Sequence, residues 1–410
     1  MPLTTIWVDM DAYFASAEQH LCPRLRGRPV GVVPVFTRDG RPAEGSCCIA
    51  VSYQARPSGV RTGTPVHEAR RLCPDIRFVH ARPAEYVRLH HAIVGIVESV
   101  LPVHRVYSID ELACRLDGAE RCPVYAASVG VAIKRAMRER LSDALTCSIG
   151  AAPNRLLAKV AADARKPNGL NIVEDRMLPG CLYELDLEDW PGIGGGMRAR
   201  FERAGVMTTE QMYALTEHEM ARVFGSIDGQ RWWMQIRGFD VPEKRTVRRT
   251  LGHQHVLPPE KRGAEEARCV LVRLLTKAAQ RLRREGYRAG ELVCAGRLLP
   301  EGQWSRRTVL PPTSSTGVLL RAMAEQWASA PRCRYITVAV TLGAMTRAAG
   351  SPGPLFDREK DEERLDEAVD KINARFGYGA VRPASADVVS APMRISFTSI
   401  PDLEMPDLHG

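Results

Sequence analysis

The sequence predicts an α+β protein built from several domains. Two separate stretches each show β-prone runs and helical patterns in the order β-α-β-β-α-β, which is typical of a ferredoxin-like antiparallel sheet backed by helices. Between them, residues 174–240 form short helical patterns separated by glycine-containing turns. A chain of 410 residues is also long enough for two or more hydrophobic cores.

The first β-α-β-β-α-β unit comprises residues 1–28 and 79–173. Asp11 is a candidate N-cap for its first helix, because a carboxylate can accept hydrogen bonds from the free N–H groups at a helix start. In chain order, the predicted elements are an N-terminal strand, a helix over 12–18, a helix from 85, a strand that ends at 109, a helix over 125–140 and a strand over 145–151.

Residues 29–78 interrupt the first unit as a small insert. Two β-prone runs, 29–36 and 47–53, are followed by glycine and proline turn signals and by a short helix that ends near Cys73. The insert is therefore predicted to combine short strands with one helix.

A proline-glycine-hydrophobe-glycine sequence, Pro191 to Gly194, joins two short helices in the segment 174–240. Glycine lets the backbone approach a phosphate, which can then bind at the N-terminus of the second helix. This pattern indicates a helix-hairpin-helix with Gly192 and Gly194 as DNA contacts, although an ordinary helix-capping turn uses the same residues.

A basic module begins after a charged linker at 241–247. Residues 241–350 contain 20 Lys and Arg against 8 Asp and Glu, whereas the whole chain has a net charge of +9. This concentration fits a surface that follows a nucleic-acid backbone, although an Arg-rich composition would also raise the charge. Arg248 and Arg249, at the start of the module, are candidate DNA-binding residues.

The second β-α-β-β-α-β unit lies at 248–345 and has one predicted core. Its strands are predicted at 249–256, 290–298, 303–309 and 334–342, and its helices around 271–282 and over 316–329. Alternation in the last strand places Ile336 and Val338 on one face and Tyr335 on the other. A charged helix near 358–375 follows in the tail, 346–410.

Two acidic stations lie in the first unit. Asp9 follows the β-prone run Ile6 to Val8, and Asp110 with Glu111 follows Val106 to Ile109, so two strands of one sheet can bring these carboxylates together. Mg²⁺ prefers a few carboxylates and fills its other positions with water and phosphates, and paired ions clamp the attacking and leaving oxygens in phosphoryl transfer. An isolated Asp-Glu pair is usually a solvated turn, but two matched stations favour a magnesium site.

Composition excludes several other classes of protein. No stretch approaches the roughly 20 apolar residues of a membrane span, and the chain opens in a strand rather than a signal peptide. We therefore expect a cytoplasmic protein with no membrane partner. The 11 cysteines are scattered without C-x-x-C spacing, so neither a disulfide framework nor a zinc site is predicted.

A series of short motifs follows one another between residues 4 and 345. They are Val8 to Phe14, Tyr53 to Arg56, Ser108 to Glu111, Ser148 to Gly150 with Asn154, Lys159 to Asp163, Lys166 to Gly169 and Pro191 to Gly194. In this order they resemble the motifs of the Y-family DNA polymerases, the translesion enzymes, and within them the bacterial polymerase IV (DinB-like) branch. The combination is highly specific, although any one motif could arise by chance.

The resemblance implies a right-hand polymerase that is a monomer and carries out low-fidelity, template-directed translesion synthesis on primer-template DNA with dNTP substrates. The implied parts are a palm at 1–28 and 79–173, fingers at 29–78, a helix-hairpin-helix thumb at 174–240, a linker at 241–247, a little finger at 248–345 and a tail at 346–410.

The resemblance also implies a catalytic site. Asp9, Asp110 and Glu111 would be the catalytic residues and would hold two Mg²⁺ ions together with the backbone carbonyl of Met10; Mn²⁺ is an alternative ion. Phe14 would be a steric gate against the ribose 2′-hydroxyl, although a core aromatic residue fits the same position, and Ile49 would roof the nascent base pair. The implied nucleotide-binding residues are Tyr13, Phe14, Tyr53, Arg56 and Lys166.

Leu355 and Phe356 resemble the apolar end of a sliding-clamp-binding peptide. The usual upstream glutamine is missing, because Ser351 and Pro352 precede Pro354-Leu355-Phe356. A linker that happens to contain Leu-Phe explains the sequence equally well.

Two other functions compete with the polymerase. A non-catalytic Y-family-like accessory protein would bridge the sliding clamp, DNA and another polymerase, but such proteins lack the acidic ligands that are present here. A nucleotide cyclase also uses two metal ions in catalysis, but this function would leave the hairpins of 174–240 and the basic module unexplained.

Overall fold

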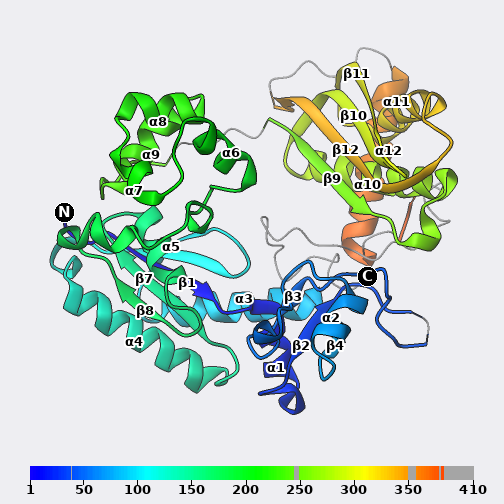
Figure 1. The fold of residues 1–410 in the computed structure, drawn as a ribbon. Helices are drawn as coiled ribbons and strands as arrows, with labels where there is room; N and C mark the ends of the chain where they lie inside the picture. Colours follow the sequence, from blue (N-terminus) through cyan, green and yellow to red (C-terminus); the bar gives the residue numbers. More distant parts are fainter. Residues whose placement is uncertain (38, 244–248, 350–356, 378–379, 383–410) are drawn as a thin grey trace. The chain divides into compact units, whose positions relative to one another are not determined.

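The computed structural model describes residues 1–37, 39–243, 249–349, 357–377 and 380–382 (Figure 1). Contacts within the chain define two compact units, the first with the described residues up to 243 and the second with those from 249 onward. In these ranges, none of the helices combines the length and the apolar character that crossing a bilayer requires.

A five-stranded sheet in the order β5-β6-β1-β7-β8 forms the centre of the first unit. Its strands are β1 (Thr5–Met10), β5 (Val103–Val106), β6 (Glu111–Arg115), β7 (Cys147–Ala152) and β8 (Leu170–Ile172). β1 is buried along its whole length and pairs antiparallel with β6 and β7, whereas β7 and β8 are parallel. A fully buried central strand therefore carries Asp9.

Four helices accompany this sheet. They are α1 (Tyr13–Leu21), α3 (Pro83–Glu98), α4 (Pro123–Arg140) and α5 (Arg155–Asp163). α5 starts at the N-cap Asn154, whose side chain accepts a hydrogen bond from the N–H of Leu157, and it packs on β7 and β1. A Cβ atom at Gly150 would lie 2.0 Å from the carbonyl oxygen of Ala158, so only glycine lets α5 lie this close to β7.

The insert at 29–78 has a small sheet of its own. Its elements are β2 (Val30–Val33), β3 (Ala50–Val51), α2 (Val66–Leu72) and β4 (Arg77–His80), and the strand order is β3-β2-β4. Val33, Val51, Val60 and Val66 lie in its core. Of the second predicted strand, 47–53, Ala50–Val51 pairs with β2, and Cys47 makes an isolated antiparallel bridge with Pro65.

Short helices make up the segment 174–240. They are α6 (Gly195–Arg203), α7 (Thr209–Ala214), α8 (Glu217–Phe224) and α9 (Asp228–Ile236). Trp190, Phe201 and Ile236 are buried in the core that this segment shares with α5. The predicted hairpin joins a 3₁₀ turn at Leu187–Asp189 to α6 rather than two α-helices.

The second unit is an antiparallel sheet in the order β11-β10-β12-β9, packed against helices (Figure 1). Its elements are β9 (Leu251–Val256), α10 (Ala264–Arg284), β10 (Tyr287–Leu299), β11 (Gln303–Thr313), α11 (Thr316–Ala328), β12 (Arg334–Arg347) and α12 (Asp357–Phe376). Leu271, Leu275 and Leu282 of α10 are fully buried, as their helical spacing predicts.

The prediction for Tyr335 is wrong. Tyr335 is fully buried, like Val338, instead of facing away from it. Leu298 pairs with Tyr335 and its neighbour Arg297 pairs with Thr337, so one extra residue is inserted in β12. A bulge of this kind moves the side chains on one side of it to the other face of the sheet.

α12 binds to its unit through ion pairs. The Asp370 carboxylate lies 2.7 Å from Nε of Arg283, and the Glu363 carboxylate lies 2.6 Å from Arg288. The side chains of Arg283 and Arg288 are only 11% and 12% exposed. The acidic side of α12 thus compensates cations that are largely removed from water.

Candidate active site

A pocket of about 360 Å³ lies in the first unit between β1, the start of β6 and the insert. It brings together all the residues proposed from sequence for metal and nucleotide binding and for the base-pair roof. These are Asp9, Met10, Tyr13, Phe14, Ile49, Tyr53, Arg56, Asp110, Glu111 and Lys166. Lys159, Asp163 and Thr62 also line the pocket and had no predicted role.

Pairing of β1 with β6 brings the two acidic stations together. Asp9 is the register partner of Glu111 on the neighbouring antiparallel strand. In addition, the N–H of Met10 donates to the carbonyl of Asp110 over 2.8 Å. Asp110 lies in the turn between β5 and β6, and Glu111 is the first residue of β6. The prediction that Asp110 and Glu111 directly follow the end of a strand is therefore wrong.

Burial strongly perturbs the acidic side chains. Burial raises the pKa of Asp9 to about 7, against the opposing effect of the Lys166 ammonium. Burial also raises the pKa of Asp110, although the Ser108 hydroxyl donates to its carboxylate over 2.5 Å. Carboxylates that are removed from water in this way favour a nearby cation.

Two lysines supply positive charge to these carboxylates. Lys166 Nζ lies 2.7 Å from Asp9 and 2.6 Å from Asp163. Burial works to lower the pKa of Lys166, but the two neighbouring carboxylates raise it overall. Lys159 Nζ contacts Glu111 and lies 3.9 Å from Asp9. Lys159 had no predicted role, because its place beside the carboxylates depends on the packing of α5 against β1.

The pocket suits a hard cation by its donor chemistry. In the described parts of the chain, no three Asp, Glu, His or Cys side chains are grouped closely enough to share one ion. However, Lys159 approaches Glu111 and Asp9 together, so positive charge is stabilised between these two side chains. Carboxylate and carbonyl oxygens are the ligands that Mg²⁺ prefers.

Tyr53 and Arg56 form a separate polar group in the pocket. The Arg56 guanidinium lies over the Tyr53 ring, 3.9 Å from its centroid. The Tyr53 hydroxyl is buried and makes no well-aligned hydrogen bond with the residues that the structure describes, although the Arg56 guanidinium lies close enough to interact with it. A buried hydroxyl without a well-aligned partner is costly in the absence of a ligand, which fits a bound polar group at this place.

The ring of Phe14 is held in a fixed orientation. It stacks on Tyr86 with the ring centroids 4.6 Å apart and an interplanar angle of 16°. Tyr13, next to it, is buried and donates its hydroxyl hydrogen to the carbonyl of Tyr86 over 2.6 Å. Phe14 therefore presents a rigid wall to the pocket, whereas the Tyr13 hydroxyl is already engaged.

Asp11 does not cap helix α1, so that prediction is wrong. The N-cap position belongs to Ala12, which has a left-handed backbone and makes no side-chain cap. The buried Asp11 carboxylate instead accepts hydrogen bonds from the hydroxyls of Thr146 and Ser148, each over 2.8 Å, and from the N–H of Asn168 over 2.7 Å. Asp11 thus binds β1 to the loop that carries Lys166.

The candidate DNA contacts have different outcomes. Gly192 has a φ of +96°, a conformation that favours glycine, and Gly194 is the N-cap of α6. Arg249 is exposed just before β9. Arg248 and the candidate clamp residues Leu355 and Phe356 lie outside the described residues.

Two family models match the chain. The model of the impB/mucB/samB family matches residues 8–163, and that of the impB/mucB/samB family C-terminal domain matches residues 248–353. The chain belongs to this family. Two relatives of this family member are named DNA polymerase IV. That of Moorella thermoacetica is 32% identical over 92% of this chain and 94% of its own length, and that of Pelotomaculum thermopropionicum is 29% identical over 91% and 92%.

Solved structures share the fold of this impB/mucB/samB family member. A Y-family DNA polymerase chimera matches with a TM-score of 0.66 at 22% identity, over 84% of this chain and 99% of the other. The insertion ternary complex of Dbh DNA polymerase matches with a TM-score of 0.55 at 22% identity, over 83% and 98%. The predicted multidomain α+β polymerase fold is therefore confirmed.

Proposed function

We propose that Asp9, Asp110 and Glu111 are the catalytic carboxylates that transfer a nucleotide from a dNTP to a primer 3′-hydroxyl. Membership of the family, with relatives named DNA polymerase IV, makes the chain a DNA-directed DNA polymerase of the translesion class. The observation that supports the site best is the pairing of Asp9 with Glu111, in a pocket that also contains Tyr53, Arg56 and Lys166.

Asp9, Asp110, Glu111 and the Met10 carbonyl would hold two Mg²⁺ ions, or Mn²⁺, which share a preference for hard oxygen ligands. When bound, such ions acidify the primer hydroxyl and neutralise the departing pyrophosphate.

The remaining side chains act on the nucleotide. Tyr53, Arg56 and Lys166 would bind the triphosphate, because a hydroxyl and two cations offset its negative charge. The contacts of Lys166 with Asp9 and Asp163 support this role, since they hold its ammonium beside the acidic stations. Ile49 would cover the nascent base pair.

Phe14 would select deoxyribose over ribose. Its stacking on Tyr86 supports this role, because the contact stabilises the ring at the wall of the pocket.

The domain assignment follows the same reasoning. We assign the palm to 1–28 and 79–173, the fingers to 29–78, the thumb to 174–240, the linker to 241–247 and the little finger to 248–345. Primer-template DNA would contact the hairpin at Gly192 and Gly194 and the basic little finger. We further propose that the protein is a cytoplasmic monomer and that Leu355 and Phe356, in the tail from 346 onward, bind the sliding clamp.

Primer extension on undamaged and lesion-bearing templates tests the catalytic site. The Asp110→Ala/Glu111→Ala double variant should lose extension on both templates while its binding to primer-template DNA stays within about twofold of the parent. Primer extension by the double variant at the rate of the parent would disprove the catalytic role of Asp110 and Glu111. Absence of extension by the parent, with intact DNA binding, would favour the non-catalytic accessory protein instead.

A further inference from the structure

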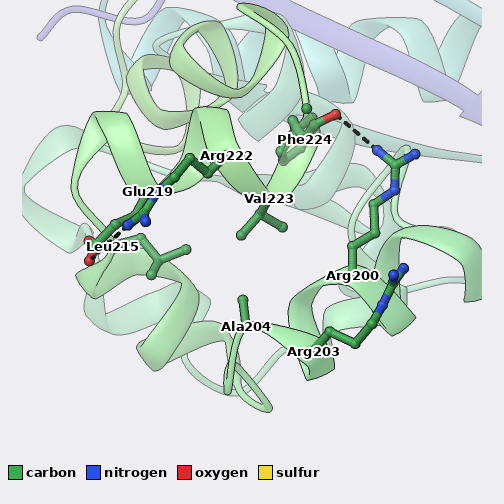
Figure 2. A pocket seen from close by; sticks show the side chains of 9 residues that line it. Arg200, Arg203, Ala204, Leu215, Glu219, Arg222, Val223 and Phe224 are labelled. Carbon is green, nitrogen blue, oxygen red and sulfur yellow. Dashed lines mark hydrogen bonds and ion pairs between the residues drawn. The ribbon is translucent and has the colours of Figure 1, made fainter.

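A second pocket lies among the short helices of the segment 174–240 (Figure 2). Its volume is about 700 Å³, within the range of typical ligand sites. Residues of α6 and α8, and residues that directly follow α6, α7 and α8, line it. These are Arg200, Arg203, Ala204, Leu215, Glu219, Arg222, Val223, Phe224 and Gly225.

Arginine side chains give this pocket a positive rim. Arg200 donates to the carbonyl of Phe224 over 2.9 Å, and Arg203 donates to the carbonyl of Ala199 over 3.0 Å. Both acceptors are neutral, and within the described ranges neither arginine has an ion pair. Across the hollow, the Arg222 guanidinium is 3.9 Å from Glu219.

The positive charge at this rim comes from Arg200 and Arg203 and not from every arginine of α6. Arg198, on the same helix, is compensated by Glu188 at 3.2 Å and by Glu202 at 2.9 Å. Arg198 does not line the pocket. Among the residues that the structure describes, the arginines of α6 without an ion pair are therefore the two that line the pocket.

One part of the pocket wall is apolar, although the lining as a whole is more polar than apolar. Leu215, Val223 and Ala204 point into the hollow from different sides in Figure 2. Glu219 lies on the rim beside Arg222, and its carboxylate also accepts hydrogen bonds from the N–H and the hydroxyl of Thr216. A ligand with negative charge is therefore directed toward the side with Arg200 and Arg203.

This combination selects an acidic peptide rather than a nucleic-acid backbone. A phosphate backbone requires positive charge but has no side chain to fill an apolar hollow. Moreover, the proposed DNA contact at Gly194 caps the start of α6, whereas Arg203 is its last residue, about 13 Å away at 1.5 Å per residue. The pocket and the hairpin are thus at opposite ends of the helix.

We propose that this pocket binds an acidic segment of a partner protein through one apolar anchor. The anchor fills the space between Leu215 and Val223, and carboxylates on either side of it pair with Arg200 and Arg203. A bidentate arginine-carboxylate pair gives orientation, and the buried anchor gives affinity. The binding site is separate from the proposed catalytic pocket.

Fluorescence anisotropy with the full-length protein tests the proposal. One labelled peptide contains Asp, Glu and Ser around a central Leu-Phe pair, and its twin has Ala-Ala in the centre. The Leu-Phe peptide should bind about tenfold tighter than the twin. Arg200→Ser/Arg203→Ser should weaken its binding about tenfold or more, whereas the matched control Arg198→Ser should leave it within about twofold.

A second variant keeps the result interpretable. Val223→Ser should remove the preference for the Leu-Phe peptide, whereas the Ala-Ala control peptide should bind as it does to the parent. Circular dichroism checks that each variant is folded. Equal binding of the two peptides by the parent, or no binding, would overturn the proposal. It would also be overturned if Arg200→Ser/Arg203→Ser lowered affinity for primer-template DNA and left peptide binding intact, because the pocket would then be a nucleic-acid surface.

Discussion

Asp11→Asn offers the most direct test of how the pocket is positioned. The Asp11 carboxylate accepts from Thr146, Ser148 and the N–H of Asn168 at 2.7–2.8 Å. The Asn amide has the same shape but only one acceptor oxygen and no charge. If that oxygen takes the place of Oδ2, it still accepts from Thr146 and Asn168, but these two hydrogen bonds are then neutral. Hydrogen bonds to charged groups contribute about 1.5–3 kcal/mol and neutral ones about 0.5–1.5 kcal/mol.

The difference is about 1 kcal/mol for each retained bond, or about 2 kcal/mol in all. We expect this loss to loosen the loop that holds Lys166. If this loss is fully expressed in dNTP binding, the KM for a correct dNTP should rise about 30-fold, since each 1.4 kcal/mol corresponds to about tenfold in binding, whereas kcat should change less. Single-nucleotide insertion kinetics on an undamaged template would measure both quantities.

Thr146→Val is the matched control. It removes the hydroxyl that donates to Asp11 but leaves the bond between Asp11 and Asn168. The free energy of unfolding should therefore fall by about 2 kcal/mol while KM stays within about twofold. If Asp11→Asn lowers the melting temperature but leaves the KM unchanged, Asp11 only stabilises the fold and our reasoning about the Lys166 loop is refuted.

Other predictions concern the steric gate, the helix contact and the buried carboxylate. Phe14→Ala should raise ribonucleotide insertion about tenfold or more; insertion as poor as in the parent would reject the gate. Gly150→Ala should destabilise the protein by about 3 kcal/mol in urea, because the new Cβ would lie 2.0 Å from the Ala158 carbonyl; an unchanged midpoint would contradict this packing. The pKa of Asp9 is raised from 3.8 to about 7, so the favourable contribution of its protonated form to stability is lost as pH rises through 7. In chelator, Asp9→Asn should therefore increase the melting temperature more at pH 8 than at pH 5, and an equal increase at both values would show that burial does not perturb Asp9.

Local patterns in the sequence were enough to predict that these carboxylates come together. Asp9 and the Asp110-Glu111 pair each follow a β-prone run, and a residue near a strand end needs only a neighbouring strand to acquire a partner. The same holds for helix α10, whose leucines repeat at helical spacing. The fold class was predictable for this reason, since two β-α-β-β-α-β patterns imply two sheets backed by helices.

The features that sequence reasoning missed depend on distant parts of the chain. Asp11 looks like a helix cap because its neighbours are helical, but its partners are Thr146, Ser148 and Asn168, more than 130 residues away. Lys159 joins the acidic stations only after α5 packs against β1. Tyr335 is buried because of an extra residue in β12, and a two-residue period cannot reveal where such an insertion occurs.

The helix at the end of the second unit matters to anyone who shortens this protein. If the polypeptide stopped after β12, Arg283 and Arg288 would lose the carboxylates of Asp370 and Glu363. Such a fragment would display cations that the full chain shields and would attract nucleic acid to the helical side of the unit. Its measured DNA affinity would then overstate that of the chain that keeps α12.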